Sequence, residues 1–89
     1  MKDRIRKLRE SLGLDRTMFE AETSIKAKTW ANVENGIQRA NEEHIAAVIK
    51  KWPQYAYWLT TGLTIPEAGQ ISPELEEIRK DQNLLTGTE

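Results

Sequence analysis

The sequence predicts an all-α protein, a bundle of five short helices with an additional C-terminal helix. Two observations support this fold class. Apolar residues recur three and four positions apart in successive segments, which is the period of a helix face. Residues that favour helix ends separate these segments, with Gly13 and Gly62 after helices and Asp15 and Asn41 before them. No segment requires a β-strand, and 89 residues suffice for one core.

Three helices are expected in the first 36 residues. The first ends at Leu12, because Gly13 can adopt the left-handed conformation that stops a helix. The second spans 15–23 with Asp15 as its N-cap, and the third spans 27–35 after a short break. The side chains expected in the core are Ile5, Leu8 and Leu12, then Met18 and Phe19, then Trp30 and Val33. A neighbouring face of the first helix carries Lys2, Arg6 and Arg9, of which Arg6 and Arg9 are expected to be solvated rather than bound to DNA.

Two further helices are expected between residues 41 and 62. Asn41 supplies an N-cap, and the following acidic pair favours the positive end of a helix that ends near 50–51. Pro53 lies in the first turn of a short aromatic helix, where proline is tolerated. The expected core side chains are Ile45, Val48 and Ile49, then Tyr55, Trp58 and Leu59. His44, the sole histidine, is expected to be a partly exposed helix residue rather than a metal ligand or a general base.

The pattern changes after residue 62. Residues 63–70 contain proline and glycine without periodicity and are expected to form an extended linker. A C-terminal helix within 71–89 starts at Ser-Pro-Glu, 72–74, and its end from residue 83 is expected to fray. Its narrow apolar stripe consists of Ile71, Leu75, Ile78 and Leu85. One helix cannot bury this stripe alone, so the stripe either folds onto residues 1–62 or joins two subunits. The candidate dimerisation residues are Ile71, Leu75 and Ile78.

The composition excludes several classes of protein. Because the chain has no cysteine, it has neither disulfides nor thiolate metal sites. No apolar run approaches the roughly 18 residues of a membrane helix, and the first residues are charged, so a cytoplasmic protein is expected. No nucleophile–base pair, phosphate-cradling loop or metal-ligand spacing occurs. We therefore expect no catalytic residue, no metal, no cofactor and no small-molecule ligand.

The charge of the chain is unevenly distributed. The formal net charge of -1 and the pI near 5.9 are weak evidence for nucleic-acid binding, which usually requires a basic surface. Residues 1–40 nevertheless hold nine Lys and Arg against six Asp and Glu, whereas residues 41–89 hold four against eight. A basic first half therefore precedes an acidic second half.

The segment from Asp15 to Gly36 has the pattern of a helix-turn-helix unit, two short helices joined by a tight turn. In such a unit the second helix enters the major groove of double-stranded DNA. Lysine can donate to guanine, asparagine can pair with adenine, and an alanine methyl can contact a thymine methyl. The candidate base-reading residues, opposite the inward stripe, are Ala27, Lys28, Ala31 and Asn32. The candidate phosphate-contacting residues are Arg16, Asn35, Gln38 and Arg39.

The same residues resemble a known family, the XRE or Cro/CI type of helix-turn-helix regulators, which are similar to phage repressors. The match runs without gaps from Leu12-Gly13-Leu14 to Val33-Glu34-Asn35-Gly36, and this ending is its most specific part. The resemblance covers roughly residues 3–62. It implies a five-helix lambda-repressor-like bundle, repressor-like activity and a homodimer on a pseudo-palindromic operator. The family's base-reading positions fall on Ala27, Lys28 and Asn32, and its phosphate-contacting glutamine position holds Arg16.

Some positions depart from the family pattern. Alanine is usual where Glu20 stands, and glycine is usual where Ser24 stands. Because a small residue lets the two helices approach closely, Glu20 implies a wider crossing or a carboxylate turned to solvent. The aromatic segment 55–62 resembles a phage-associated subset of the family.

The sequence is also compatible with a second function. The acidic surplus after residue 41 is compatible with a protein-interaction module, such as an antitoxin or a phage antagonist, that binds a basic partner with the same bundle. Each subunit has few basic groups that can contact DNA, so a DNA-binding regulator built from this chain would need two subunits on two half-sites.

Overall fold

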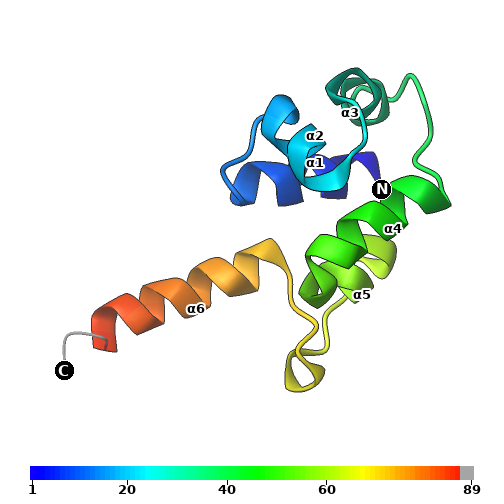
Figure 1. Ribbon diagram of the computed structural model, residues 1–89. Coiled ribbons are helices and arrows are strands. Elements are labelled where there is room, and N and C mark those ends of the chain that lie inside the picture. The colour runs from blue at the N-terminus through cyan, green and yellow to red at the C-terminus, as the bar shows by residue number, and fades with distance from the viewer. Residues whose placement is uncertain (87–89) are drawn as a thin grey trace.

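Six α-helices and two short 3-10 turns make up the part of the chain that the computed structural model describes, residues 1–86, with side chains up to residue 82 (Figure 1). No strand occurs in this part. The elements are α1 (Lys2–Ser11), α2 (Arg16–Thr23), α3 (Ala27–Glu34), α4 (Glu42–Lys51), η1 (Pro53–Tyr55), α5 (Ala56–Thr61), η2 (Pro66–Ala68) and α6 (Pro73–Thr86). The all-α prediction is therefore confirmed, and every expected helix is present.

Side-chain caps start two of these helices where the sequence predicted them. The carboxylate of Asp15 accepts a hydrogen bond from the backbone N–H of Met18 at 2.8 Å. Asn41 and His44 form a reciprocal capping box, in which each side chain accepts from the other residue's backbone N–H, at 3.0 and 3.1 Å. The His44 ring also lies 5.5 Å from that of Trp30, and the side chain is buried, so the prediction of a partly exposed His44 was wrong.

Aromatic and branched aliphatic side chains fill the core between α1 and α5. The fully buried ones are Ile5, Leu8, Phe19, Trp30, Val33, Val48 and Leu59. The ring of Phe19 lies 4.6 Å from that of Trp30 and 5.6 Å from that of Trp52, which joins α2, α3 and the end of α4. Met18 was also predicted to face the core, but its side chain is 50% exposed. Because successive residues on a helix point about 100° apart, Phe19 takes the inward position and Met18 does not.

Residues 63–70 form a closed turn rather than the extended linker that the sequence suggested. Ile65 and Gln70 exchange two backbone hydrogen bonds of 2.8 and 3.0 Å around η2. The side chain of Gln70 fixes this turn to the bundle, because it accepts from the N–H of Tyr57 and donates to the carbonyl of Pro53. The turn therefore sets where the following helix begins.

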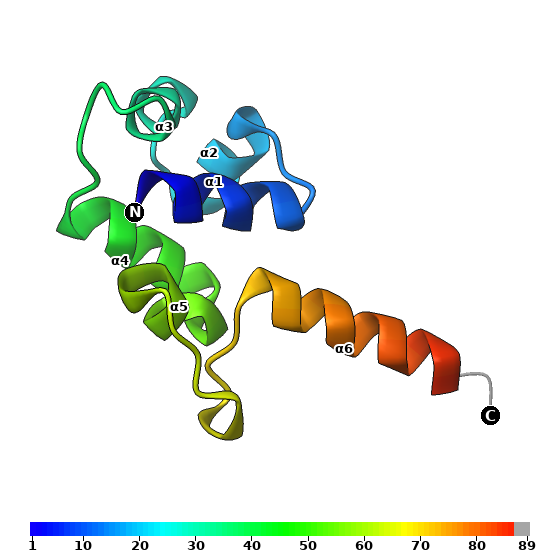
Figure 2. The ribbon, with the colours of Figure 1, turned by 180° about the vertical axis from the view of Figure 1, so that it is seen from behind.

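Helix α6 projects away from the other helices, so the molecule measures 46 by 24 by 20 Å (Figures 1 and 2). Its start is attached, since Ile71 packs on the core and Lys7 of α1 pairs with Glu74. The apolar stripe becomes more exposed along the helix, from the half-buried Leu75 to Ile78. Fraying was predicted from residue 83, but α6 continues to Thr86. The side chain of Leu85 and residues 87–89 lie outside the described part. No helix within residues 1–86 combines the length and the apolar character needed to cross a membrane.

Candidate nucleic-acid interface

Helix α3 lies at an edge of the molecule with its outer side turned away from the other helices (Figures 1 and 2). Its inner side is anchored, because Trp30 and Val33 are both fully buried. The turn from α2 to α3 passes through Ser24, which takes a left-handed conformation at φ 63°. Few residues other than glycine adopt that conformation readily, so serine here carries a strain that the surrounding contacts must offset.

A hydroxyl in the last turn of α2 fixes α3 relative to α2. The indole Nε1–H of Trp30 donates to Thr23 Oγ1 at 3.0 Å, and that hydroxyl donates to the carbonyl of Phe19 at 2.7 Å. The backbone N–H of Ile25 also bonds to the same oxygen, at 3.3 Å. Because this oxygen is buried and serves α2, the turn and α3 together, it restricts how α3 can rotate.

The four candidate base-reading residues lie on the accessible part of α3. Lys28 is exposed, and Ala27, Ala31 and Asn32 are partly exposed. Lys28 forms no ion pair with any residue whose side chain the structure describes. The backbone carbonyl of Asn32 accepts from the N–H groups of Ile37 and Gln38, which folds the following loop back against the end of the helix. The outer side of α3 thus presents one cation and one amide between small side chains.

The loop after α3 brings three of the four candidate phosphate-contacting residues to the surface. Asn35, Gln38 and Arg39 are all exposed. Arg39 makes no ion pair within the described side chains. Gln38 and Arg39 line a hollow of about 380 Å³ beside the first residues of α1, where Lys2 supplies a second cation.

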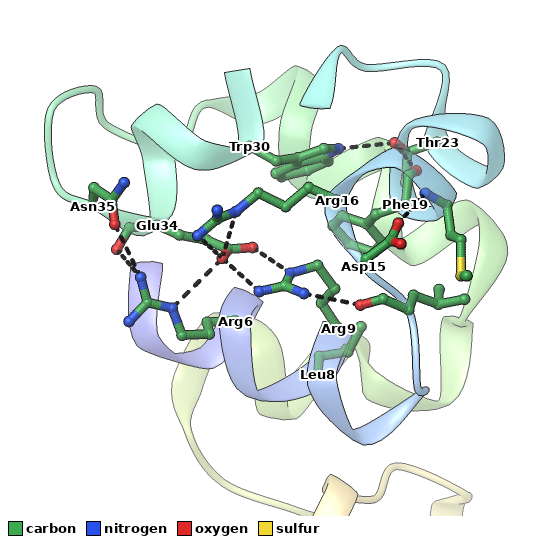
Figure 3. Close-up of polar contacts among 12 residues, drawn as sticks. Arg6, Leu8, Arg9, Asp15, Arg16, Phe19, Thr23, Trp30, Glu34 and Asn35 are labelled. Carbon is green, nitrogen blue, oxygen red and sulfur yellow. Dashed lines mark hydrogen bonds and ion pairs between the residues drawn. The ribbon is translucent and has the colours of Figure 1, made fainter. Parts of the chain in front are cut away.

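The fourth candidate, Arg16, belongs to a cluster of three arginines around one buried carboxylate (Figure 3). The side chain of Glu34 is 0% exposed. Arg9 binds both of its carboxylate oxygens, at 2.8 and 2.9 Å, and also donates to the carbonyl of Leu14. Arg16 reaches one oxygen at 3.2 and 3.3 Å, and Arg6 reaches the same oxygen at 3.5 Å. The tight pair is therefore Arg9 with Glu34, and the other two arginines are held more loosely.

This cluster leaves positive charge at the surface between α1, α2 and α3. Three guanidinium groups meet a single carboxylate, and the side chains of Arg6 and Arg16 remain 39% and 36% exposed. Burial by itself raises the pKa of Glu34, but the hydrogen bond and charge of Arg9, followed by those of Arg16, outweigh it, so the pKa lies below its ordinary value. The hydrogen bond to Glu34 in turn raises the pKa of Arg9. Glu34 is therefore ionised at neutral pH.

Sequence reasoning overlooked this cluster. Arg9 was predicted to be solvated, but it is buried. The available signal was helical spacing, because Arg9 follows Leu8 and precedes Leu12 by three, which places it at the edge of the inward stripe. Glu34 likewise follows Trp30 by four positions. Opposite charges at the edges of two apolar stripes indicate a buried pair, although spacing alone cannot say that the two helices meet there.

Arg6 makes a further contact that bears on the candidate site. One of its guanidinium nitrogens donates to the side-chain oxygen of Asn35 at 3.1 Å and to the backbone carbonyl of Glu34 at 3.3 Å. An asparagine amide has one oxygen and one NH2 group, so binding the oxygen orients the NH2 group away from Arg6. Arg6 therefore positions a donor of Asn35 at the rim of α3.

Glu20, the main departure from the family pattern, turns its carboxylate to the surface at the start of α3. One of its oxygens accepts a hydrogen bond from the backbone N–H of Ala27 at 2.8 Å. The Phe19 and Trp30 rings remain in contact, so α2 and α3 still pack closely. Of the two expectations for Glu20, the structure has the carboxylate turned to solvent.

The three candidate dimerisation residues occupy different environments. Ile71 is partly buried against the core of its own chain, and its backbone N–H donates to the carbonyl of Gln54 at 2.9 Å. Leu75 is half-buried, and Ile78 is exposed. The part of the stripe that remains available to another molecule is therefore centred on Ile78.

No protein-family model matches the chain, and no curated protein is similar to it in sequence.

Proposed function

We propose that the protein is a sequence-specific double-stranded DNA-binding regulator of the XRE or Cro/CI type, with a lambda-repressor-like five-helix bundle. The observation that carries this proposal is that α3 has one buried, apolar side and one accessible, polar side. Trp30 and Val33 anchor the helix, while the exposed Lys28 and the partly exposed Asn32 lie on its opposite side. An α-helix presented in this way fits the width of the major groove.

In this proposal α3 reads bases and its surroundings position it. Lys28 donates to guanine and Asn32 pairs with adenine, while the methyl groups of Ala27 and Ala31 contact thymine. The flanking phosphates are bound by the exposed Gln38 and Arg39, by the amide of Asn35, and by Arg16 from the edge of the arginine cluster. Together these groups cover both sides of the inserted helix.

A homodimer on a pseudo-palindromic operator is part of the proposal. One subunit offers few unpaired cations near α3, and each phosphate contact adds only a limited affinity at physiological salt. Two subunits with α3 in successive major grooves double the number of contacts. The exposed part of the α6 stripe around Ile78 is the surface that we assign to this association.

Selection of duplexes from a random pool tests the proposal directly. The purified chain is incubated with the pool at about 150 mM salt, since binding at low salt does not discriminate specific from non-specific contacts. We expect enrichment of an inverted repeat whose half-site centres lie about 10 base pairs apart or a multiple of that. Footprinting of the enriched duplex should then protect both half-sites. A pool that stays random after repeated rounds would contradict the proposal.

A second candidate function, a protein-interaction module such as an antitoxin or a phage antagonist, is favoured by one observation. Ile37, three residues after the end of α3, is 76% exposed and so offers a large apolar side chain for contact beside this helix. Together with the acidic second half, it suits a basic protein partner with an apolar contact. Undetectable or salt-insensitive duplex binding, combined with co-purification of a basic protein whose retention requires Ile37, would favour this function instead.

A further inference from the structure

Glu20 occupies the position of a helix cap although it belongs to the preceding helix. Its side chain accepts from the N–H of Ala27, the first residue of α3. Lys26, the residue immediately before α3, makes no side-chain cap hydrogen bond. The first N–H groups of a helix have no intrahelical partner, and the side chain of the preceding residue normally accepts from the second or third of them. A residue seven positions upstream thus bonds one of the N–H groups that the local sequence leaves without a side-chain partner.

The carboxylate of Glu20 also changes the electrostatics of this helix end. The N-terminus of a helix carries partial positive charge and is a ready site for phosphate groups. Glu20 is exposed and forms no ion pair with the described side chains, so its negative charge is not neutralised locally. A phosphate that approached the start of α3 would meet both this charge and an N–H group that is already bonded.

We propose that Glu20 caps α3 from α2 and keeps phosphate groups away from the N-terminus of α3. The effect on DNA binding rests on the proposed function. Duplex DNA is then held through the side chains of α3, of the loop after it and of Arg16, and the attraction of the helix N-terminus for phosphates, which does not depend on the base sequence, is reduced. Glu20 is therefore a positioning residue that lowers affinity for arbitrary duplexes while it fixes the first turn of α3, which carries Ala27 and Lys28.

The cap can be tested without DNA, by NMR of the amide of Ala27. At pH 7 this bond should slow the hydrogen exchange of the Ala27 amide in the native chain and in Glu20→Gln, whose side-chain oxygen still accepts it. In Glu20→Ala, which has no acceptor, the exchange should become faster. In Glu22→Ala, the matched control on the same helix, the exchange of Ala27 should stay slow because Glu22 pairs with Lys51 instead. An Ala27 amide that exchanges at the same rate in the native chain and in Glu20→Ala would overturn the cap.

Duplex binding tests the exclusion of phosphate. Affinity for a duplex of arbitrary sequence is measured at several salt concentrations for the native chain, Glu20→Gln and Glu22→Gln. We expect Glu20→Gln to bind about two- to fivefold more tightly, the range that one charge at a helix terminus provides, and Glu22→Gln to change less. Equal affinities for the native chain and Glu20→Gln would overturn the exclusion and leave the proposed function standing. Absence of duplex binding by all three proteins would contradict both the exclusion and the proposed function, while the hydrogen exchange of Ala27 would still decide the cap.

Discussion

Arg9 and Glu34 form a two-point ion pair inside the protein, with N–O distances of 2.8 and 2.9 Å. The pair joins α1 to the last turn of α3 and so ties the helix that carries the candidate base-reading residues to the first helix of the bundle. Removing one partner of a buried pair leaves an uncompensated charge, which costs about 3 to 5 kcal/mol. The orientation of α3 therefore depends on an interaction on its inner side.

The first prediction concerns acid stability. The pKa of Glu34 is lowered in the folded protein, so the unfolded chain binds a proton at a higher pH than the folded one does. The stability due to this carboxylate is present above its ordinary pKa and is lost as the pH falls through the lowered value. We expect the free energy of unfolding, measured with urea, to decrease steeply below about pH 4.5, the ordinary range of a glutamate. Glu34→Gln should be less stable at pH 7 and should lack much of that decrease.

A milder variant keeps this prediction testable if Glu34→Gln does not fold. Arg9→Lys retains the positive charge but cannot bind both oxygens in the planar geometry of a guanidinium. We expect it to fold with reduced stability and a shallower loss of stability in acid. An acid profile identical to that of the native chain would show that the pair does not shift the titration of Glu34.

The second prediction concerns the hydroxyl between α2 and α3. Thr23→Val keeps the shape of the side chain but removes the acceptor for the Trp30 indole N–H, which is then buried without a partner. Such a loss costs about 1 to 3 kcal/mol, measured as the change in free energy of unfolding. Thr17→Val, an exposed threonine on the same helix, is the matched control and should change stability by less than about 0.5 kcal/mol. Equal effects at the two positions would argue against the buried bond.

The third prediction concerns the strained residue in the turn. Ser24 adopts φ 63°, which costs an L-residue roughly 1 to 2 kcal/mol, whereas glycine adopts it without a steric penalty but loses more backbone entropy on folding. We expect Ser24→Gly to raise the free energy of unfolding by about 0.5 to 1 kcal/mol. Ser24→Ala, which retains a Cβ, should not stabilise the protein. A lower stability of the glycine variant would mean that the serine side chain contributes more than its strain costs.

Local features of the fold were predictable from the sequence because they depend on neighbouring residues. Asp15 and Asn41 cap the helices that they precede, and Trp30 and Val33 lie in the core as their spacing indicated. A capping interaction and an inward stripe each span only a few residues. Sequence reasoning therefore located the helices and the outer side of α3.

Interactions between distant residues could not be predicted in the same way. Arg9 and Glu34 are 25 positions apart, and nothing local says that α1 and α3 cross where these two side chains lie. Glu20 was recognised as unusual, but its bond to Ala27 depends on the crossing of α2 with α3. The turn at residues 63–70 is fixed by Gln70, whose side chain bonds to Pro53 and Tyr57. These partners lie far from Gln70 in the sequence, so the residues of the turn itself do not predict the bonds.

The fourth prediction separates base reading from phosphate contact. Asn32→Ala should weaken binding to the selected duplex by about 1 to 3 kcal/mol and relax the preference at one base pair, because a bidentate amide contact is lost. Arg39→Ala should instead weaken binding to every duplex and reduce the salt dependence, because it removes one phosphate contact. Affinities for single-base variants of the selected site, measured at several salt concentrations, distinguish the two effects. An unchanged base preference for Asn32→Ala rejects its proposed role.

The fifth prediction concerns the open end of the α6 stripe. Ile78 is 52% exposed on a helix that projects from the bundle, whereas Leu63 is 61% exposed on a loop that the proposed dimer does not use. A charge inserted into an apolar contact opposes association, because it would have to be desolvated without a partner. We therefore expect sedimentation equilibrium to give a dimer mass for the native chain and for Leu63→Glu but a monomer mass for Ile78→Glu. Circular dichroism should show the same helix content in all three, because neither side chain is buried in one subunit. Loss of the dimer in both variants would indicate a general effect of added negative charge, and a monomeric native chain would mean that α6 does not join two subunits.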